Sequence, residues 1–422
     1  MSTSSSAAAR PGAAPSPDPT RRATFADVFA VPEFRTVFAS FGIFMIGETV
    51  KMLALSVLIY ERTGSSLIAA LAYVAGFLPH ALGGIFLLSL ADRWRPRVLM
   101  VGYDLIRLVM VVVLATGVLP PVAMLALVFT VGLVAPVSNA ARTALLPDLL
   151  DGDAYVLGRS LFTVAAGATQ VLGFGVGGLL LNLVGPYGAL WLTAATCAIS
   201  ALLLRFGLRD RPPRTAAPGA GAPGAIGETW RVNRLLLADR RVRGLLLAQW
   251  LPGSLLVGAE GVVVPYTAAL GSGLDAGTAS GVLFMAAAAG MLVGDLIVGR
   301  FVAPGMRERL TPWLALLLGV PMLAFVLNPA LAPAAALFAL ATAGSAYQLG
   351  LARRFLEAVP PERRGQSFGL AGIGFMTAQG AAAAGAGALG EVIAPGIVMA
   401  LAGGGSLLAT LLLWRWLSGK DA

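Results

Sequence analysis

The chain has 422 residues, of which 57% are hydrophobic and only 12% are charged, and its mean hydropathy is +0.82. Soluble domains carry roughly a quarter charged residues, so this composition excludes an ordinary soluble protein and indicates a membrane protein. The net charge of +9 does not indicate nucleic-acid binding, because the basic residues lie in loops and form no basic face with interleaved aromatics. One cysteine, Cys197, excludes a disulfide within the chain.

Residues 1–24 are rich in Ser, Ala, Pro and Arg, which predicts a disordered cytoplasmic tail. Twelve apolar segments follow, each close to the ~20 residues that a bilayer requires. Their approximate spans are 36–60, 66–91, 98–118, 121–142, 160–184, 188–207, 244–269, 278–300, 311–328, 332–354, 366–389 and 394–416. We therefore expect an all-α membrane fold of two pseudo-symmetric six-helix bundles at 25–207 and 244–417, joined by a cytoplasmic linker at 208–243.

The basic residues indicate how the chain is oriented. With both termini inside, the loops on the cytoplasmic side hold nearly all the arginines, Arg142 among them, and the outer loops hold only Arg62. Such an asymmetry predicts a multi-pass protein with both termini in the cytoplasm. Arginine greatly outnumbers lysine, and with the high Ala and Gly content this suggests a high-GC bacterial source and location in the bacterial plasma (inner) membrane.

A short basic turn ends the second apolar segment. Asp92-Arg93 is followed by Arg95 and Arg97, and the next apolar run begins at Val98. This pattern resembles the loop between helices 2 and 3 of the major facilitator superfamily of secondary transporters. The resemblance implies the major facilitator fold over about 35–416, and a cytoplasmic gate in which Asp92, Arg93 and Arg97 lock helix ends together in one state of the transport cycle.

A second resemblance concerns the fourth and fifth segments. Ala141 to Phe162 (ARTALLPDLLDGDAYVLGRSLF) and the following GFGVGGLL are similar to the branch of that superfamily that contains enterobactin and macrolide efflux proteins. This resemblance implies an exporter.

Several ionisable residues lie inside apolar segments, where a charge costs ~3 kcal/mol or more unless it is paired or hydrated. Glu48 lies near the middle of the first segment, with Lys51 one turn later, so Glu48 is a candidate for proton exchange or, alternatively, one partner of a neutralising pair. Glu260 occupies a comparable position in the seventh segment, and the two carboxylates could face one cavity. The alternative for Glu260 is a hydrogen bond to an outer loop.

The remaining candidates have structural alternatives of equal weight. His80, the only histidine, could relay protons or pack between helices. Asp104 and Arg107, three residues apart, could form a charge relay or a self-satisfied pair. The amides of Gln170 and Gln249 could line the pathway or bridge helices, and the glycine-rich runs around Gly178 and Gly387 favour close helix packing.

Enzyme motifs occur only in contexts that exclude their function. Gly365 to Gly369 (GQSFG) matches the hydrolase nucleophile elbow, but it opens a membrane segment and no strand precedes it. The glycine fingerprints at 385–390 and 219–224 follow no strand, and no phosphate-binding Walker loop exists. We therefore expect no enzyme activity, no cofactor and no metal site.

These observations favour a secondary transporter that exports a small amphipathic or cationic organic compound, such as a drug, secondary metabolite or siderophore, by proton-coupled alternating access. Protonation of Glu48, with Glu260 as the second candidate, would shift the balance between the two states. The expected partners are the substrate, protons and the lipid bilayer, with no nucleic acid, and we expect a monomer. The alternatives are a proton-coupled importer of a small metabolite and a transport-silent membrane sensor or scaffold.

Overall fold

The structure is a computed structural model that describes residues 24–76, 79–80, 82–83, 94–212, 225–271, 273–359 and 364–419. Within these ranges the regular secondary structure is helical and contains no strand. The predicted tail lies outside the described residues except for Thr24, which caps helix α1 (Phe25–Ala30) through a reciprocal pair of hydrogen bonds with Asp27.

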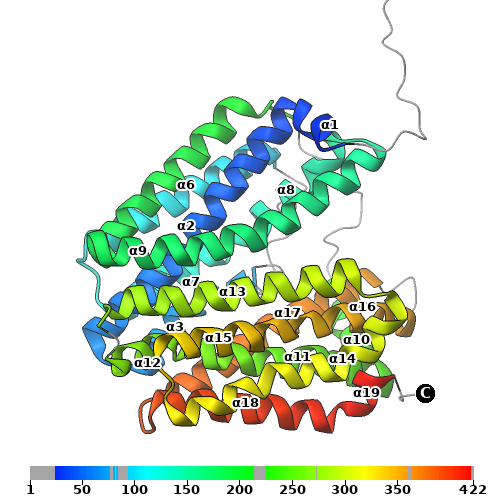
Figure 1. The fold of residues 1–422 in the computed structure, drawn as a ribbon. Helices are drawn as coiled ribbons and strands as arrows, with labels where there is room; N and C mark the ends of the chain where they lie inside the picture. The colour runs from blue at the N-terminus through cyan, green and yellow to red at the C-terminus, as the bar shows by residue number, and fades with distance from the viewer. Residues whose placement is uncertain are drawn as a thin grey trace, which may run out of the picture.

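Prolines and glycines determine where the helices of the first half begin and end. α2, α6 and α7 each begin at a proline, whose missing N–H costs a first helical turn nothing. Gly185 has a φ of 69° and precedes Pro186, so α9 is divided there into two helices that run in opposite directions (Figure 1). The elements after α1 are α2 (Pro32–Thr63), α3 (Ser66–Tyr73), α6 (Pro96–Ala115), α7 (Pro121–Gly132), α8 (Ala135–Leu149) and α9 (Gly152–Gly207).

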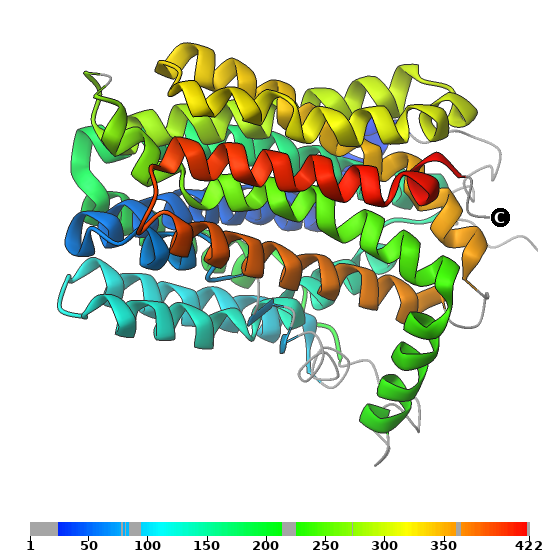
Figure 2. The same cartoon turned by 90° about the horizontal axis from the view of Figure 1, so that it is seen from below.

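The second half is divided into more helical elements than the first, and several of them are joined by short turns. Its elements are α10 (Ala225–Ala238), α11 (Arg240–Gly261), α12 (Val263–Leu270), α13 (Ala276–Phe301), α14 (Pro304–Gly319), η1 (Pro321–Leu327), α15 (Leu331–Ala343), η2 (Gly344–Ala346), α16 (Tyr347–Ala358), α17 (Arg364–Leu389), α18 (Pro395–Leu412) and α19 (Trp414–Ser418). α10 lies within the predicted linker and runs across the end of the other helices (Figure 2). The exact boundaries of the two bundles and of the linker stay a prediction.

Nine helical stretches among the described residues are long and apolar enough to cross a membrane. They are Pro32–Thr63, Pro96–Ala115, Pro121–Leu149, Leu157–Gly207, Arg240–Gly261, Ala276–Phe301, Gly305–Leu327, Leu331–Ala358 and Pro395–Leu412. The prediction of an all-α, multi-pass membrane fold is confirmed. The count of twelve stays a prediction, because Leu157–Gly207 covers two of the predicted segments, and those predicted at 66–91 and 366–389 are not among the nine stretches.

The segment predicted at 66–91 is not one regular helix in its described part. α3 ends at Tyr73, and residues 74–76 form a turn before helical geometry resumes at Pro79. Pro79 has no N–H to donate to the carbonyl of Ala75, and its ring crowds that carbonyl, which favours a kink or break in the helix there. This break lies beside the cavities described below.

Among the described residues, the most extensive contacts between the halves are those of α9 with α13 and of α3 with α17. Glycines allow the first pair to approach closely, since a Cβ built on Gly281 would lie 2.6 Å from the Cα of Gly178. Gly387 of α17 has the same role in the second pair, because a Cβ there would lie 2.8 Å from the Cβ of Ala70. The glycine-rich runs therefore serve close packing, as predicted.

The halves are in contact at one end of the molecule and separate toward the other. Hydrogen bonds cross between them near the turns that follow α2 and precede α13, including Asn182 to Asp275 (2.6 Å) and Ser65 to Glu391 (2.7 Å). Figure 1 shows the first stretch of α9 rising away from α13 toward the side that carries α1 and the C-terminus. We call this open side the basic end, because the starts of α2, α11 and α14 carry arginines there, and we call the other the closed end.

Candidate functional site

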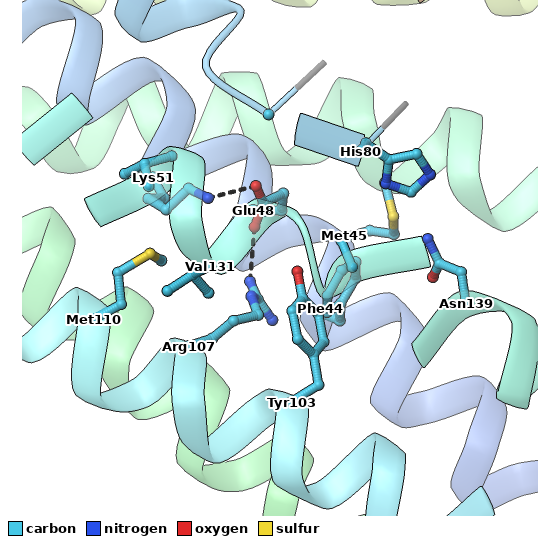
Figure 3. Close-up of a pocket in the computed structure, with 14 residues that line it drawn as sticks. Phe44, Met45, Glu48, Lys51, His80, Tyr103, Arg107, Met110, Val131 and Asn139 are labelled. Carbon is cyan, nitrogen blue, oxygen red and sulfur yellow. Dashed lines mark hydrogen bonds and ion pairs between the residues drawn. The ribbon is translucent and has the colours of Figure 1, made fainter. Parts of the chain in front are cut away.

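A cluster of charged side chains lies inside the first half, between α2 and α6. Glu48 of α2 contacts two cations, Lys51 on the same helix and Arg107 on α6 (Figure 3). The Arg107 guanidinium lies 2.9 Å from Glu48 Oε2, and the Lys51 ammonium donates a hydrogen bond to Oε1. Lys51 and Arg107 are buried, whereas the Glu48 side chain is 32% exposed. Both carboxylate oxygens of Glu48 are therefore engaged by cations.

Asp104 extends this cluster to a third helix. It is buried, its Oδ1 lies 3.5 Å from the Arg107 guanidinium, and its Oδ2 accepts a 2.6 Å hydrogen bond from Ser200 of α9. The sequence suggests two separate pairs, Glu48 with Lys51 and Asp104 with Arg107. The structure joins them into one network, in which Arg107 is closer to Glu48 than to Asp104.

Arg142 is a member of this region that the sequence misplaces in a cytoplasmic loop. α8 continues to Leu149, so Arg142 lies two turns inside the helix and is only 4% exposed. Its guanidinium donates to Asn139 Oδ1 at 3.3 Å and lies 5.2 Å from the ring centre of Phe44. Its Nε has no hydrogen-bond partner, and no described carboxylate forms an ion pair with it. The segment boundary predicted from hydropathy, at residue 142, lies about two turns before the end of α8. The i, i+3 spacing of Asn139 and Arg142 was the sequence signal that the helix continues there.

Two adjoining cavities surround Glu48. The first has a volume of about 190 Å³ and lies within the first half, between α2, α6, α7 and α8. The second, of about 250 Å³, extends from Glu48 to Gln170 of α9 and Met376 of α17, so it lies where the halves face each other. Glu48, Lys51 and His80 line both cavities. We call these two spaces together the central cavity.

The structure brings the predicted His80 and Gln170 to the central cavity and leaves Gln249 outside it. His80 faces it from beside Met45, and its imidazole makes no hydrogen bond with a described residue (Figure 3). Gln170 lines the part between the halves. Gln249 of α11 lines neither space. Its backbone carbonyl accepts a 2.8 Å hydrogen bond from the Tyr347 hydroxyl.

Glu260 does not share a cavity wall with Glu48, contrary to the expectation that both face one space. Its carboxylate accepts a 2.9 Å hydrogen bond from the Tyr73 hydroxyl, and Tyr73 lines the central cavity in its place. The Tyr73 ring stacks on Phe284 at 4.8 Å, and Phe284 stacks on Phe174 at 4.9 Å. Tyr73 belongs to the first half and Glu260 to the second, so this hydrogen bond crosses between them. No described cation forms an ion pair with Glu260.

The predicted gate is only partly visible. Asp92 and Arg93 lie outside the described residues. Arg97, at the start of α6, is half-buried and makes no hydrogen bond or ion pair with a described residue. Its neighbour Arg95, for which the resemblance implies no role, forms an ion pair with Asp210 after α9. The gate assignment of Asp92, Arg93 and Arg97 stays a prediction.

The central cavity can bind a ligand non-covalently and exchange protons. It offers two cations, a carboxylate, an imidazole and a primary amide from Lys51, Arg107, Glu48, His80 and Gln170. In the part of the chain that the structure describes, no three His, Cys, Asp or Glu side chains are grouped to hold a metal ion.

Comparison with known sequences gives one family-wide match and one short match. Residues 37–352 match the sequence model of the family described as Major Facilitator Superfamily. A stretch of 74 residues is 32% identical to Macrolide efflux protein A of Streptococcus pyogenes. This stretch spans 18% of this chain and 18% of that curated relative.

Solved structures share the whole fold at low sequence identity. A peptide transporter POT in complex with sulfate aligns with a TM-score of 0.69 and 13% identity, over 91% of this chain and 94% of that one. A D-xylose-proton symporter aligns with a TM-score of 0.68 and 16% identity, over 91% of this chain and 97% of that one. Identities this low establish the fold alone.

Proposed function

Because the chain belongs to the Major Facilitator Superfamily, we propose that it is a proton-coupled secondary transporter that exports a small amphipathic organic compound. The family and the fold are those of transporters. In this mechanism the two halves open alternately to the two sides of the membrane around a central site.

The orientation in the membrane follows from the arginines. Cytoplasmic loops of membrane proteins carry an excess of Lys and Arg, so the basic end is the cytoplasmic end and both termini lie in the cytoplasm. At the opposite end Arg62 is the exception, and its guanidinium is engaged by the carbonyls of Gly117 and Leu119. The described conformation is then open to the cytoplasm and closed to the outside, the state in which an exporter collects its substrate.

The hydrogen bond between Glu260 and Tyr73 is the observation that supports proton coupling. A carboxylate away from water is unfavourable when ionised, and a single hydroxyl donor compensates it only partly. Proton uptake by Glu260 removes that charge, and the bond it alters joins the two halves. Protonation of Glu260 therefore changes the relative free energies of the two states, which is the requirement for coupling.

Glu48 is less suited to carry the proton, which reverses the order of the two candidates drawn from the sequence. Two cations oppose the neutralisation of its carboxylate, because a proton there would leave Lys51 and Arg107 without their counter-ion. We assign Glu48 to organising the charges of the central cavity, and Glu260 to proton exchange.

The direction of transport rests on the similarity to Macrolide efflux protein A, a protein whose name denotes export. Import is the alternative, since the solved relatives include a D-xylose-proton symporter. A silent sensor or scaffold is the second alternative. Fold and topology are common to all three functions, so flux measurements decide between them.

We test the proposal with inverted membrane vesicles that hold an acidic lumen, using a pH-sensitive dye and a panel of amphipathic drugs, siderophores and other metabolites. A substrate should dissipate the gradient in wild-type vesicles. Glu260→Gln should reduce this substrate-dependent proton flux to background, because a glutamine cannot carry a proton. The matched control is Glu357→Gln, at an exposed position whose partner is Arg353 on the surface of α16, which should leave the flux unchanged.

Each other outcome has a defined meaning. Full proton flux in Glu260→Gln would exclude Glu260 as the carrier, and loss in Glu48→Gln alone would restore the original order. Radiolabelled substrate that leaves inverted vesicles together with protons would indicate import. Stable, folded protein with no substrate-dependent flux for any compound would contradict transport.

A further inference from the structure

An apolar groove opens on the outer surface of the helices next to the central cavity. It has a volume of about 670 Å³ and lies between α3, α7 and α17. Leu71, Val122, Phe129 and Ala381 are among its lining residues, and Thr377 is its one polar side chain. Val122 is 72% exposed, so the groove faces the surroundings of the helix bundle. In a chain that spans a membrane those surroundings are lipid.

Only a single layer of residues separates this groove from the central cavity. Ala75 lines both spaces. Next to it, Pro79 lines the groove while His80 lines the cavity, and on α17 Thr377 lines the groove while Met376 lines the cavity. Part of the wall is the turn after α3, where regular helical hydrogen bonding is interrupted. A ligand can therefore place one part in each space when this short wall moves aside.

The charges around the central cavity are not balanced. Its described lining contains two basic side chains, Lys51 and Arg107, and one carboxylate, Glu48. The next layer adds Asp104 and the buried Arg142, so the wider cluster holds three cations and two carboxylates. Glu260, further along at the closed end, is bonded to Tyr73 and forms no ion pair with these cations. An excess positive charge away from water favours binding of an anion.

We infer that the transported ligand is an amphipathic organic anion, whose negative group binds beside Lys51 and Arg107 while its apolar part occupies the groove between α3, α7 and α17. This inference rests on the proposed transport function and specifies its substrate class. It replaces the cationic alternative suggested by the sequence, and it gives the ligand a path from the lipid into the central cavity.

The test uses two ions of nearly equal shape and opposite charge, tetraphenylborate and tetraphenylphosphonium. Their dissociation constants are measured on the purified full-length protein in detergent by equilibrium dialysis. Partition of each ion into micelles is the same for every variant, so the ratio between variants reports the protein alone. Lys51→Gln should weaken borate binding by at least about tenfold and leave phosphonium binding unchanged or stronger.

Four further variants separate the effects of charge, folding and the groove. Lys51→Arg keeps the charge and should keep the preference for borate, which controls for misfolding. Glu48→Gln removes the one carboxylate among the described lining residues and should strengthen borate binding. Ala126→Trp fills the groove at an exposed position and should weaken binding of either ion, whereas Ala336→Trp, at an exposed position on α15 away from the groove, should not.

Preferential binding of phosphonium that is lost in Glu48→Gln would overturn the inference and identify a cation site. Borate binding that is insensitive to Ala126→Trp would remove the groove from the site, and would leave it as a surface covered by bilayer lipid. Binding needs no proton gradient, so this test can fail while proton-coupled flux is observed, or succeed while it is not. The inference and the proposed function are thus contradicted by different results.

Discussion

Arg107 and Arg142 are both buried arginines of the first half, yet their surroundings differ in kind. Arg107 lies between two carboxylates, at 2.9 Å from Glu48 and 3.5 Å from Asp104. Arg142 has an amide and aromatic rings around it and forms no ion pair with a described carboxylate. Loss of one partner from a buried ion pair leaves the other charge uncompensated, and this consequence applies to Arg107 only.

We therefore predict opposite effects of two identical substitutions. Arg107→Met should lower the free energy of unfolding by about 3–5 kcal/mol, because Glu48 keeps only Lys51 and Asp104 keeps only the Ser200 hydroxyl. Arg142→Met should be neutral or stabilising, because it removes a buried charge and leaves no carboxylate alone. Unfolding of the purified protein in a denaturing detergent series measures both. Equal losses in the two variants would contradict this account of the cluster.

At the scale of single residues the sequence predicts which side chains are unusual but not which of them meet. Glu48, Asp104 and Arg107 are conspicuous because they interrupt apolar runs. Their contact depends on the rotation of α2 against α6, which places residues 59 positions apart within 2.9 Å. Tyr73 gave no signal at all, since a tyrosine is ordinary in an apolar segment. The partner of Glu260 was therefore not predictable.

Helix boundaries are where the sequence is most informative. Prolines begin α2, α6, α7, α14 and α18, and a glycine with a positive φ, Gly64, ends α2. These helix ends can therefore be predicted from the local sequence. α8 runs past its predicted end because it leaves the apolar zone while still helical. Hydropathy reports contact with lipid, and helices need not stop where lipid does.

The crossing of α9 and α13 yields a prediction at the same scale. A methyl group on Gly281 would meet the α9 backbone, so Gly281→Ala should separate these helices at the closed end and destabilise the described conformation by about 1–3 kcal/mol. Spin labels at the exposed positions 183 and 274, in a Cys197→Ala background, should show a longer distance. Gly372→Ala is the control, because nothing lies within 4 Å of its added Cβ and helix propensity alone predicts a gain of up to ~1 kcal/mol. An unchanged distance in Gly281→Ala would mean that the crossing does not restrict opening.

At the scale of the whole molecule, carboxylates of the second half hold the closed end to donors of the first. Glu391 accepts hydrogen bonds from the Leu67 N–H (2.8 Å) and the Ser65 hydroxyl (2.7 Å), which lower its pKa below the usual 4.5. For Asp275, burial raises the pKa, but hydrogen bonds from Asn182 and Thr278 outweigh it, so the net pKa lies below the usual 3.8. Both groups favour closure only while ionised.

The sign of the pH dependence follows from these lowered pKa values. When closure depends on an ionised carboxylate, its stabilisation is fully present above the pKa that this carboxyl group has in the open state. The stabilisation is lost as the pH falls through the lower pKa that the same group has in the closed state. In a Glu260→Gln background, which removes the protonation proposed at the bond to Tyr73, the distance between labels at 183 and 274 should thus be constant near neutral pH and lengthen below about pH 4.5. Glu391→Gln should narrow the pH range over which the distance between the labels changes. A distance that lengthens above pH 6 would contradict the assignment of this response to Glu391 and Asp275.

Lys51 gives the protein an unusual chemical property. It is the one lysine among the described residues, the second in the sequence being Lys420, and it is buried against Glu48. Acylating reagents react with neutral, accessible amines, so Lys51 resists them for as long as its ion pair persists and the central cavity stays narrow. The fraction of Lys51 acylated in a short pulse, read by peptide mass spectrometry, therefore reports how often this amine is released during turnover, and it needs no engineered cysteine or spin label.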